Sequence, residues 1–179
     1  MSDPTRLRAV FDRVEKLIEQ RWQIPVRISD VPNPFTGDLD GEVILVDHDL
    51  DIEDALFILV HLFGHTVQWN VSERARQIGF ARPGDVVWTE AALREVAAYE
   101  AEACGYSLQL LHEAGVDDLD QWVSDFAACD TAYLMHFYRT GEKLPFRSFW
   151  KDGTPKLPPR PIPDFHPTRW LSRYEGTVI

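Results

Sequence analysis

Two histidines four residues apart, His61 and His65, have the clearest potential for chemistry in this sequence. In a helix they lie about 40° apart around the axis, so both imidazoles can bind one metal ion. Asp54 and Gln68 lie seven residues before and after His61, within about 20° of its direction. The segment thus carries a polar stripe on an otherwise apolar helix. Such a stripe is costly to bury unless its groups are paired or bind metal.

A third ligand is expected from residues 88–112, a segment rich in helix-forming residues. Glu95 and Glu102 lie seven residues apart there and share one helix face. Glu100 points roughly 160° away from Glu102, which predicts a position in solvent. Two histidines and one carboxylate leave coordination positions open for water or substrate, as in catalytic rather than structural metal sites.

The spacing of the histidine pair is by itself a weak signal. With six histidines in 179 residues, such a pair arises by chance in roughly one chain in five. A hydrogen-bonded pair in the protein core is therefore an alternative interpretation. The surrounding pattern favours metal: an apolar strand, a short acidic turn, an apolar helix with the pair, and a later helix with glutamates.

The strand and helix around this pair resemble those of a known enzyme family. Residues 43–46 (VILV) and 57–65 (FILVHLFGH) resemble the strand and the H-E-x-G-H helix of zincin metallopeptidases, especially the ImmA/IrrE family. Residues 102–111 (EACGYSLQLL) are similar to that family's later helix, in which a Glu-Ala pair precedes an aromatic residue and a Leu-Leu end. The resemblance covers about residues 42–112 and implies a zincin-like fold. It implies as zinc ligands His61, His65 and Glu102.

The position after the first histidine departs from the family pattern. The family has there the glutamate that takes a proton from metal-bound water, whereas this sequence has Leu62. Loss of a general base typically lowers the rate by about 10²–10⁴-fold. Three interpretations follow: the metal serves structure or binding alone, another group supplies the base, or the chemistry needs no such base.

Several other side chains are candidates for the missing base. Glu95 lies about 10.5 Å along the helix axis from Glu102, so it can act only if the metal lies between their side chains. Tyr99 and Tyr106 follow on the same stripe and could steady an oxyanion in a hydrolytic reaction. The remaining candidates are more commonly packing or surface residues: His48, His136 and His166.

The expected function is that of a divalent-metal-dependent protein, with zinc as the first choice. It would act on a small-molecule or peptide-like substrate through metal-activated water. One alternative is a non-catalytic binding or regulatory protein on the same scaffold. Another is a non-haem iron enzyme, because two histidines and one carboxylate also form the facial triad of such enzymes.

The elements that position these side chains follow from hydrophobic periodicity. Residues 31–41 read as a loop because they contain Pro, Gly and Asn, and a polar connection follows residue 70. Together, the predicted strands and helices indicate an α+β fold, in which a small sheet packs on a helical bundle. The predicted strands are 25–29 and 42–47, and the predicted helices are 4–22, 51–70, 88–112 and 118–140.

The chain composition excludes several classes of partner and location. A net charge of −11 argues against non-specific nucleic-acid or anionic-membrane binding, since both need a cationic surface. The longest apolar run, residues 55–60, is too short to span a bilayer. No secretory signal is visible, and Cys104 and Cys129 are too few for a disulfide framework, so a cytoplasmic location is expected.

Charge divides the chain into two parts. Residues 144–179 carry a net charge of +3 and seven of the twelve prolines, whereas residues 1–143 carry −14. We expect residues 1–143 to form one metal-binding domain, and residues 144–179 an extended tail that packs on it and rims its cleft. A disordered basic tail is the alternative. The expected anchors of the tail are aromatic: Trp150, Phe165 and Trp170.

Overall fold

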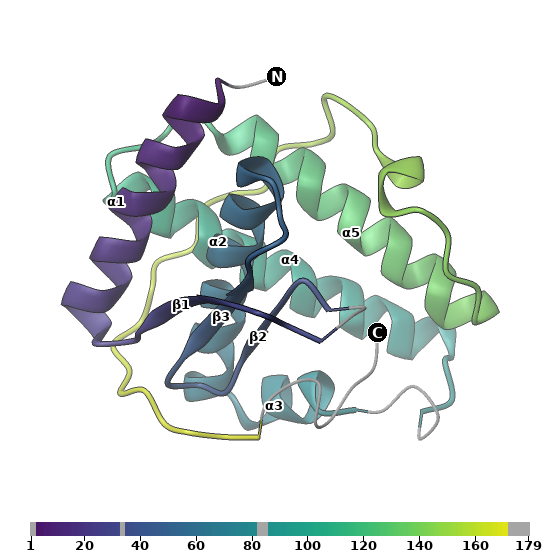
Figure 1. Ribbon diagram of the computed structural model, residues 1–179. Coiled ribbons are helices and arrows are strands. Elements are labelled where there is room, and N and C mark those ends of the chain that lie inside the picture. The colour runs from purple at the N-terminus through teal and green to yellow at the C-terminus, as the bar shows by residue number, and fades with distance from the viewer. Residues whose placement is uncertain (1–2, 33–34, 82–85, 172–179) are drawn as a thin grey trace.

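The chain folds into helices around a small sheet in the computed structural model shown in Figure 1, which describes residues 3–32, 35–81 and 86–171. This arrangement confirms the predicted α+β class. In chain order the elements are α1 (Pro4–Trp22), β1 (Val26–Ser29), β2 (Gly37–Leu39), β3 (Ile44–Asp47), α2 (Ile52–Val71), α3 (Glu73–Gly79), α4 (Glu90–Glu113), α5 (Asp120–Thr140) and a 3₁₀ turn (Phe146–Phe149).

Three of these elements were not predicted: β2, α3 and the 3₁₀ turn, which lies in the tail that was expected to be extended. Strand β2 lies inside the expected loop 31–41, because its three residues pair with β3 although Gly and Asp have low strand propensity. Helix α3 lies in the expected polar connection and is capped by Ser72, whose side chain accepts a hydrogen bond from the backbone N–H of Ala75 at 3.1 Å. Pairing with β3 stabilises β2, and the Ser72 cap stabilises α3, in segments whose composition predicts a loop.

The sheet is mixed and has β3 at its centre. Its strand order is β1-β3-β2, with β1 parallel and β2 antiparallel to β3. Ile44 and Val46 of β3 are fully buried and belong to the hydrophobic core. The sheet therefore presents an apolar face to the helices, and both β2 and β3 contact α2.

Helix α2 is the central element of the fold. It contacts α1, α3, α4 and the sheet, and Figure 1 shows it behind the strands with α1 on one side and α5 on the other. Its residues are buried on nearly every side, as the apolar sequence predicted. Among the described residues, no helix combines the length and hydrophobicity needed to cross a membrane.

Gly64 permits α2 to approach α4 closely. A Cβ atom at this position would lie 2.2 Å from the backbone oxygen of Ala103 on α4. No side chain can relieve that contact, because the neighbouring atoms belong to the helix backbone. Gly64 lies between His61 and His65 on α2, so the same close approach brings both histidines to α4.

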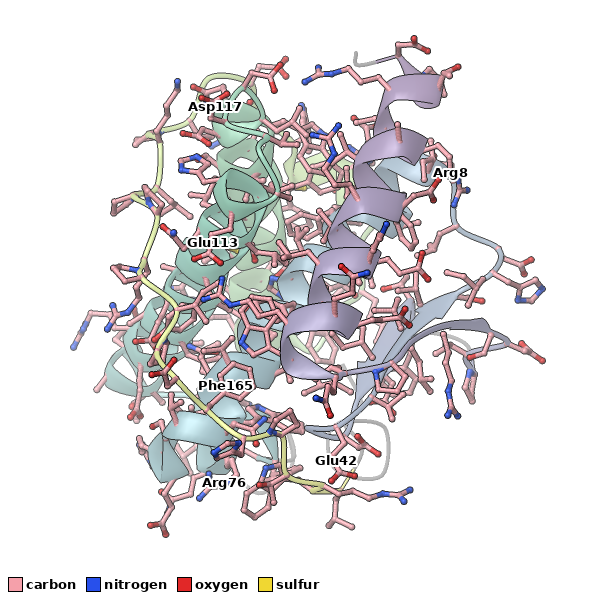
Figure 2. The ribbon with its side chains drawn as sticks, turned by 90° about the vertical axis from the view of Figure 1, so that its left-hand side faces the viewer. Arg8, Glu42, Arg76, Glu113, Asp117 and Phe165 are labelled. Carbon is pink, nitrogen blue, oxygen red and sulfur yellow. The ribbon has the colours of Figure 1, made fainter. Side chains whose placement is uncertain are left out.

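The described part of the tail, residues 144–171, runs along the outside of the helices. Its backbone N–H groups donate hydrogen bonds to Ser124 on α5 and to Gly105 on α4, from Leu157 at 3.0 Å and Arg160 at 2.9 Å. Figure 2 shows this course beside α4, with Phe165 on the tail. Phe165 stacks on a ring of α1, and Trp150 meets a ring of α5 edge-on. The backbone N–H of Trp170 donates to the carbonyl oxygen of Asp40, which follows β2, at 2.5 Å.

Candidate metal centre

Three side chains from two helices converge in the interior. Nε2 of His61 lies 3.0 Å from Nε2 of His65, and Oε2 of Glu100 lies 3.4 Å and 3.1 Å from these nitrogens. The side chains are 8%, 0% and 5% exposed, respectively. Across residues 3–32, 35–81 and 86–171, this is the buried group of His, Cys, Asp and Glu residues that could hold a metal ion.

Gln68 fixes which nitrogen of His65 carries the proton. Its side-chain NH₂ donates to Oε2 of Glu102 at 2.7 Å and to the carbonyl oxygen of Tyr99 at 2.9 Å. Its Oε1 therefore faces Nδ1 of His65, at 2.9 Å. Because an amide oxygen can only accept, Nδ1 of His65 donates, and Nε2 keeps its lone pair directed at His61 and Glu100.

The arrangement of these three groups fits a metal ion. Neutral imidazole nitrogens and a carboxylate oxygen are ligands for zinc and for non-haem iron. A tetrahedral ion with bonds of about 2.0–2.1 Å separates its ligand atoms by about 3.3 Å. The three observed separations, 3.0, 3.1 and 3.4 Å, are close to that value.

Glu100, rather than Glu102, is the carboxylate that the structure brings to the histidines. Glu100 is buried, so the prediction that it faces solvent is wrong. Glu102 instead forms an ion pair with Arg160 of the tail at 2.9 Å and accepts a hydrogen bond from Gln68. It is thus connected to His65 through Gln68, one layer outside the cluster.

The sequence of α4 contains a pattern that indicates burial of Glu100. The buried residues of α4 recur at alternating steps of three and four, which is the seam expected where two helices pack. Glu100 occupies one of these steps, and a charged residue at a core position is rarely buried without a partner. The seam consists of Leu93, Val96, Glu100, Ala103, Ser107 and Leu110.

Asp130 of α5 is a further acidic group beside the cluster, and it was also missed. Its Oδ2 lies 3.9 Å from Nε2 of His61, and its side chain is 21% exposed. It follows Val123, Phe126 and Ala127 at helical spacing on the buried side of α5. An acid on an apolar helix face was again the available signal.

Two of the three cluster residues, His61 and Glu100, line the buried end of a cavity of about 290 Å³, and His65 lies directly behind them. His61, Glu100 and Asp130 contribute to its lining. Asp54, which precedes His61 by two turns of α2, lines it as well. Leu62, which stands where the zincin pattern has glutamate, also lines it. The remaining wall is mainly apolar and aromatic and includes Phe57, Ile58, Phe126, Tyr133, Leu134 and Phe146.

Burial holds the neighbouring weak acids in one protonation state. Burial raises the pKa of the Cys104 thiol well above its usual value, and the charges of Glu100 and Asp130 raise it further. The sulfur lies 3.6 Å from Nδ1 of His61, on the side of the ring away from the cluster. Cys104 is thus a core thiol. Burial also raises the pKa of Tyr133, so its hydroxyl is neutral at pH 7.

The predicted catalytic residues of α4 lie outside the cavity lining. Glu95 pairs with Arg74 at 2.6 Å near the surface, and this hydrogen bond lowers its pKa. The ring of Tyr99 stacks on His65 with centroids 4.6 Å apart, behind the cluster. Tyr106 is buried in the hydrophobic core. The catalytic roles of Glu95, Tyr99 and Tyr106 stay predictions. Among the described residues that line the cavity, the tyrosine is Tyr133 instead of Tyr99 or Tyr106.

The other candidate histidines also lie away from the cluster. His48 is exposed after β3 and lies 3.3 Å from Asp47 and 3.2 Å from Asp49. With Asp30 and Asp47 it forms a second, more exposed group of potential ligands. The ring of His136, near the end of α5, packs against Phe149. His166 is exposed on the tail.

Comparisons of the chain with protein-family models, curated protein sequences and solved structures find no match. The resemblance to the ImmA/IrrE family therefore rests on the motifs alone. A function has to be argued from the chemistry of the cluster and its cavity.

Proposed function

We propose that this protein is a metal-dependent hydrolase that binds a divalent ion, zinc in the first instance, through His61, His65 and Glu100. The observation that carries the proposal is the convergence of three ligand atoms at the inner end of a cavity. A bound ion would polarise a substrate carbonyl and lower the pKa of a coordinated water. Three protein ligands leave a position open toward the cavity for that purpose.

The protein supports these ligands from behind. Gln68 holds His65 in the tautomer that presents Nε2. The ring of His61 stacks on Phe57 with centroids 5.2 Å apart, and the Cys104 thiol lies near its Nδ1. Such outer contacts fix ligand orientation and are worth about 10–100-fold in metal affinity.

Asp130 is the side chain we assign to the role that glutamate has in the zincin pattern. Leu62 cannot accept a proton, and three acids line the cavity in the described chain: Asp54, Glu100 and Asp130. Glu100 is a proposed ligand, and Asp54 lies about 10 Å along α2 from His61. Asp130, 3.9 Å from Nε2 of His61, is the acid within reach of the open metal position.

Metal analysis tests the ligand assignment. The full chain, purified without a histidine tag or chelator and then titrated with zinc, should bind one ion per molecule. His61→Ala and Glu100→Gln should each abolish stoichiometric binding, because each removes one of three ligands. Glu102→Gln and His112→Ala are matched controls and should retain it. Unchanged binding by Glu100→Gln would show that the ligand set is wrong.

An activity measurement then separates hydrolysis from binding alone. Zinc-loaded protein should cleave small chromogenic esters or amides faster than free zinc does. Asp130→Asn should retain zinc and lower this rate by about 10²–10⁴-fold, the usual effect of losing a general base. A zinc-loaded wild type without activity would instead favour the binding or regulatory alternative. Iron in the purified protein would favour the facial-triad alternative.

A further inference from the structure

The side chains that line the cavity range from almost fully buried to partly exposed. The proposed ligands at the inner end are almost fully buried, whereas the side chain of Asp54 is 38% exposed. Asp54 and His61 are both lining residues of α2, seven positions apart, which is about 10 Å along the helix axis. A ligand bound at the metal position therefore extends along α2 toward Asp54.

Aromatic rings form one wall between these ends. Phe57 stacks on Phe126, with centroids 4.5 Å apart and planes at 19°. Gly37 of β2 also lines the cavity and packs tightly against α2, since a Cβ there would lie 2.7 Å from Ile58 and 2.8 Å from Leu62. The volume of about 290 Å³ is at the small end of ligand cavities, which span about 300–1,000 Å³. The space suits one ring with short substituents and not a peptide segment.

The charge of the outer end is negative. Among the described residues that line the cavity, three are acidic and none is a lysine or an arginine. Arg147 of the tail lies beside the outer end, where it pairs with Asp54 and Glu53, and its guanidinium carbon is 4.5 Å from the Phe126 ring centre. One positive charge against two carboxylates leaves an excess of negative charge. This end attracts a cation and repels an anion.

From this geometry we infer that the substrates of the site are small aromatic compounds with a carbonyl-type oxygen at one end and a positively charged amine at the other. The oxygen meets the metal position, the ring lies against Phe57 and Phe126, and the amine reaches Asp54. The oxygen's place rests on the proposed function; the aromatic wall and the acidic outer end stand on their own contacts.

Three hydroxamates of equal size test the inference on the zinc-loaded full chain. They are benzohydroxamates with a para aminomethyl, hydroxymethyl or carboxylate group, compared with acetohydroxamate by calorimetry. Affinity should fall from the amine to the alcohol to the carboxylate, by about threefold or more at each step, as expected for a partly exposed ion pair. Acetohydroxamate should bind at least about tenfold more weakly than the alcohol, because it lacks the ring.

Asp54→Asn should remove the preference for the amine over the alcohol and leave binding of the alcohol within about twofold. Glu90→Gln is the matched control, since Glu90 pairs with Arg139 away from the cavity lining; it should keep the full preference. Equal affinities for the three benzohydroxamates, or tightest binding of the carboxylate, overturn this inference alone. Failure to bind zinc overturns the proposed function and this inference together.

Discussion

The amide of Gln68 holds the imidazole of His65 in a single tautomer, through a contact of 2.9 Å between Oε1 and Nδ1. The amide cannot rotate to offer its NH₂ to His65, because Glu102 and the Tyr99 carbonyl already accept from that group. Glu102 is held in turn by Arg160 of the tail. A continuous series of polar contacts thus connects Arg160 of the tail, through Glu102 and Gln68, to the proposed metal ligand His65.

Gln68→Ala should lower zinc affinity by about 10–100-fold without changing the stoichiometry, because His65 loses the group that orients it. Competition with a chromogenic chelator measures this change. Gln109→Ala is a matched control. Gln109 donates a side-chain hydrogen bond to Glu113 at 3.1 Å on the surface of α4, away from the cluster. Equal loss of affinity in the two variants would contradict an orienting role for Gln68.

Arg160→Ala should have a smaller effect than Gln68→Ala on both stability and metal affinity. Arg160 and Glu102 are 56% and 31% exposed, so their ion pair contributes no more than about 1 kcal/mol. Gln68 still holds His65 when the pair is broken. Urea unfolding and zinc competition on the same protein check both quantities, and a loss of zinc binding in Arg160→Ala would show that the tail controls the site more directly.

Gly64→Ala should destabilise the protein strongly, because the new methyl group meets the α4 backbone at Ala103. Overpacking of this kind costs about 1–3 kcal/mol or more, and it should also separate the histidines from Glu100. Gly105→Ala is the comparison on α4, where the nearest contact is the Arg160 side chain at 3.1 Å and the tail can shift. Thermal unfolding of both variants should show the larger loss at Gly64; equal losses would contradict a special role for the α2–α4 approach.

Much of the fold could be predicted from the sequence because its long helices have strong periodicity. Helix α1, for example, begins at the expected Pro4, with Asp3 as its cap. Strand β2 could not be predicted, since its Gly and Asp residues form a strand only by pairing with β3. Short elements of this kind depend on partners that lie elsewhere in the chain.

The histidine pair was predictable for the same reason, whereas the glutamate that lies beside it was not. The resemblance to the ImmA/IrrE helix implies Glu102 as a ligand, and the position of Glu100 on the opposite side of that helix predicts that Glu100 faces solvent. Neither argument establishes which face of α4 meets α2. The close approach at Gly64 decides this and selects Glu100. The two apolar seams, in α4 around Glu100 and in α5 around Asp130, were visible in the sequence, but their mutual placement requires the tertiary structure.

Asp125 should stabilise the protein at neutral pH but not in acid. Burial alone would raise its pKa, but hydrogen bonds from Thr154, Gln121 and Gly153 outweigh burial and lower the pKa below the ordinary 3.8. The ionised form is therefore favoured by folding, and its stabilisation is present above pH 3.8 and lost as the pH falls through the lowered pKa.

Asp125→Asn should accordingly cost about 1–3 kcal/mol at pH 7, because an amide cannot accept all of these hydrogen bonds. The difference from wild type should shrink below pH 3.8. Urea unfolding at pH 7 and pH 3 measures it, with exposed Asp117→Asn as the control. A difference that does not depend on pH would show that packing rather than charge holds the tail at Asp125.

Leu62→Glu, introduced into Asp130→Asn, should restore part of the hydrolytic rate. Both positions line the cavity near the open metal position, and the zincin pattern places its proton acceptor at the position of Leu62. A regain of at least about tenfold is expected, a fraction of the full effect of a general base, because Leu62 is buried and a carboxylate there is costly.

Leu62→Gln in the same background is the matched control: it has similar size and polarity but accepts no proton, so it should restore nothing. Rescue by glutamine as well as by glutamate would exclude proton transfer as the cause, and rescue by neither in zinc-loaded, folded protein would mean that Asp130 does more than accept a proton.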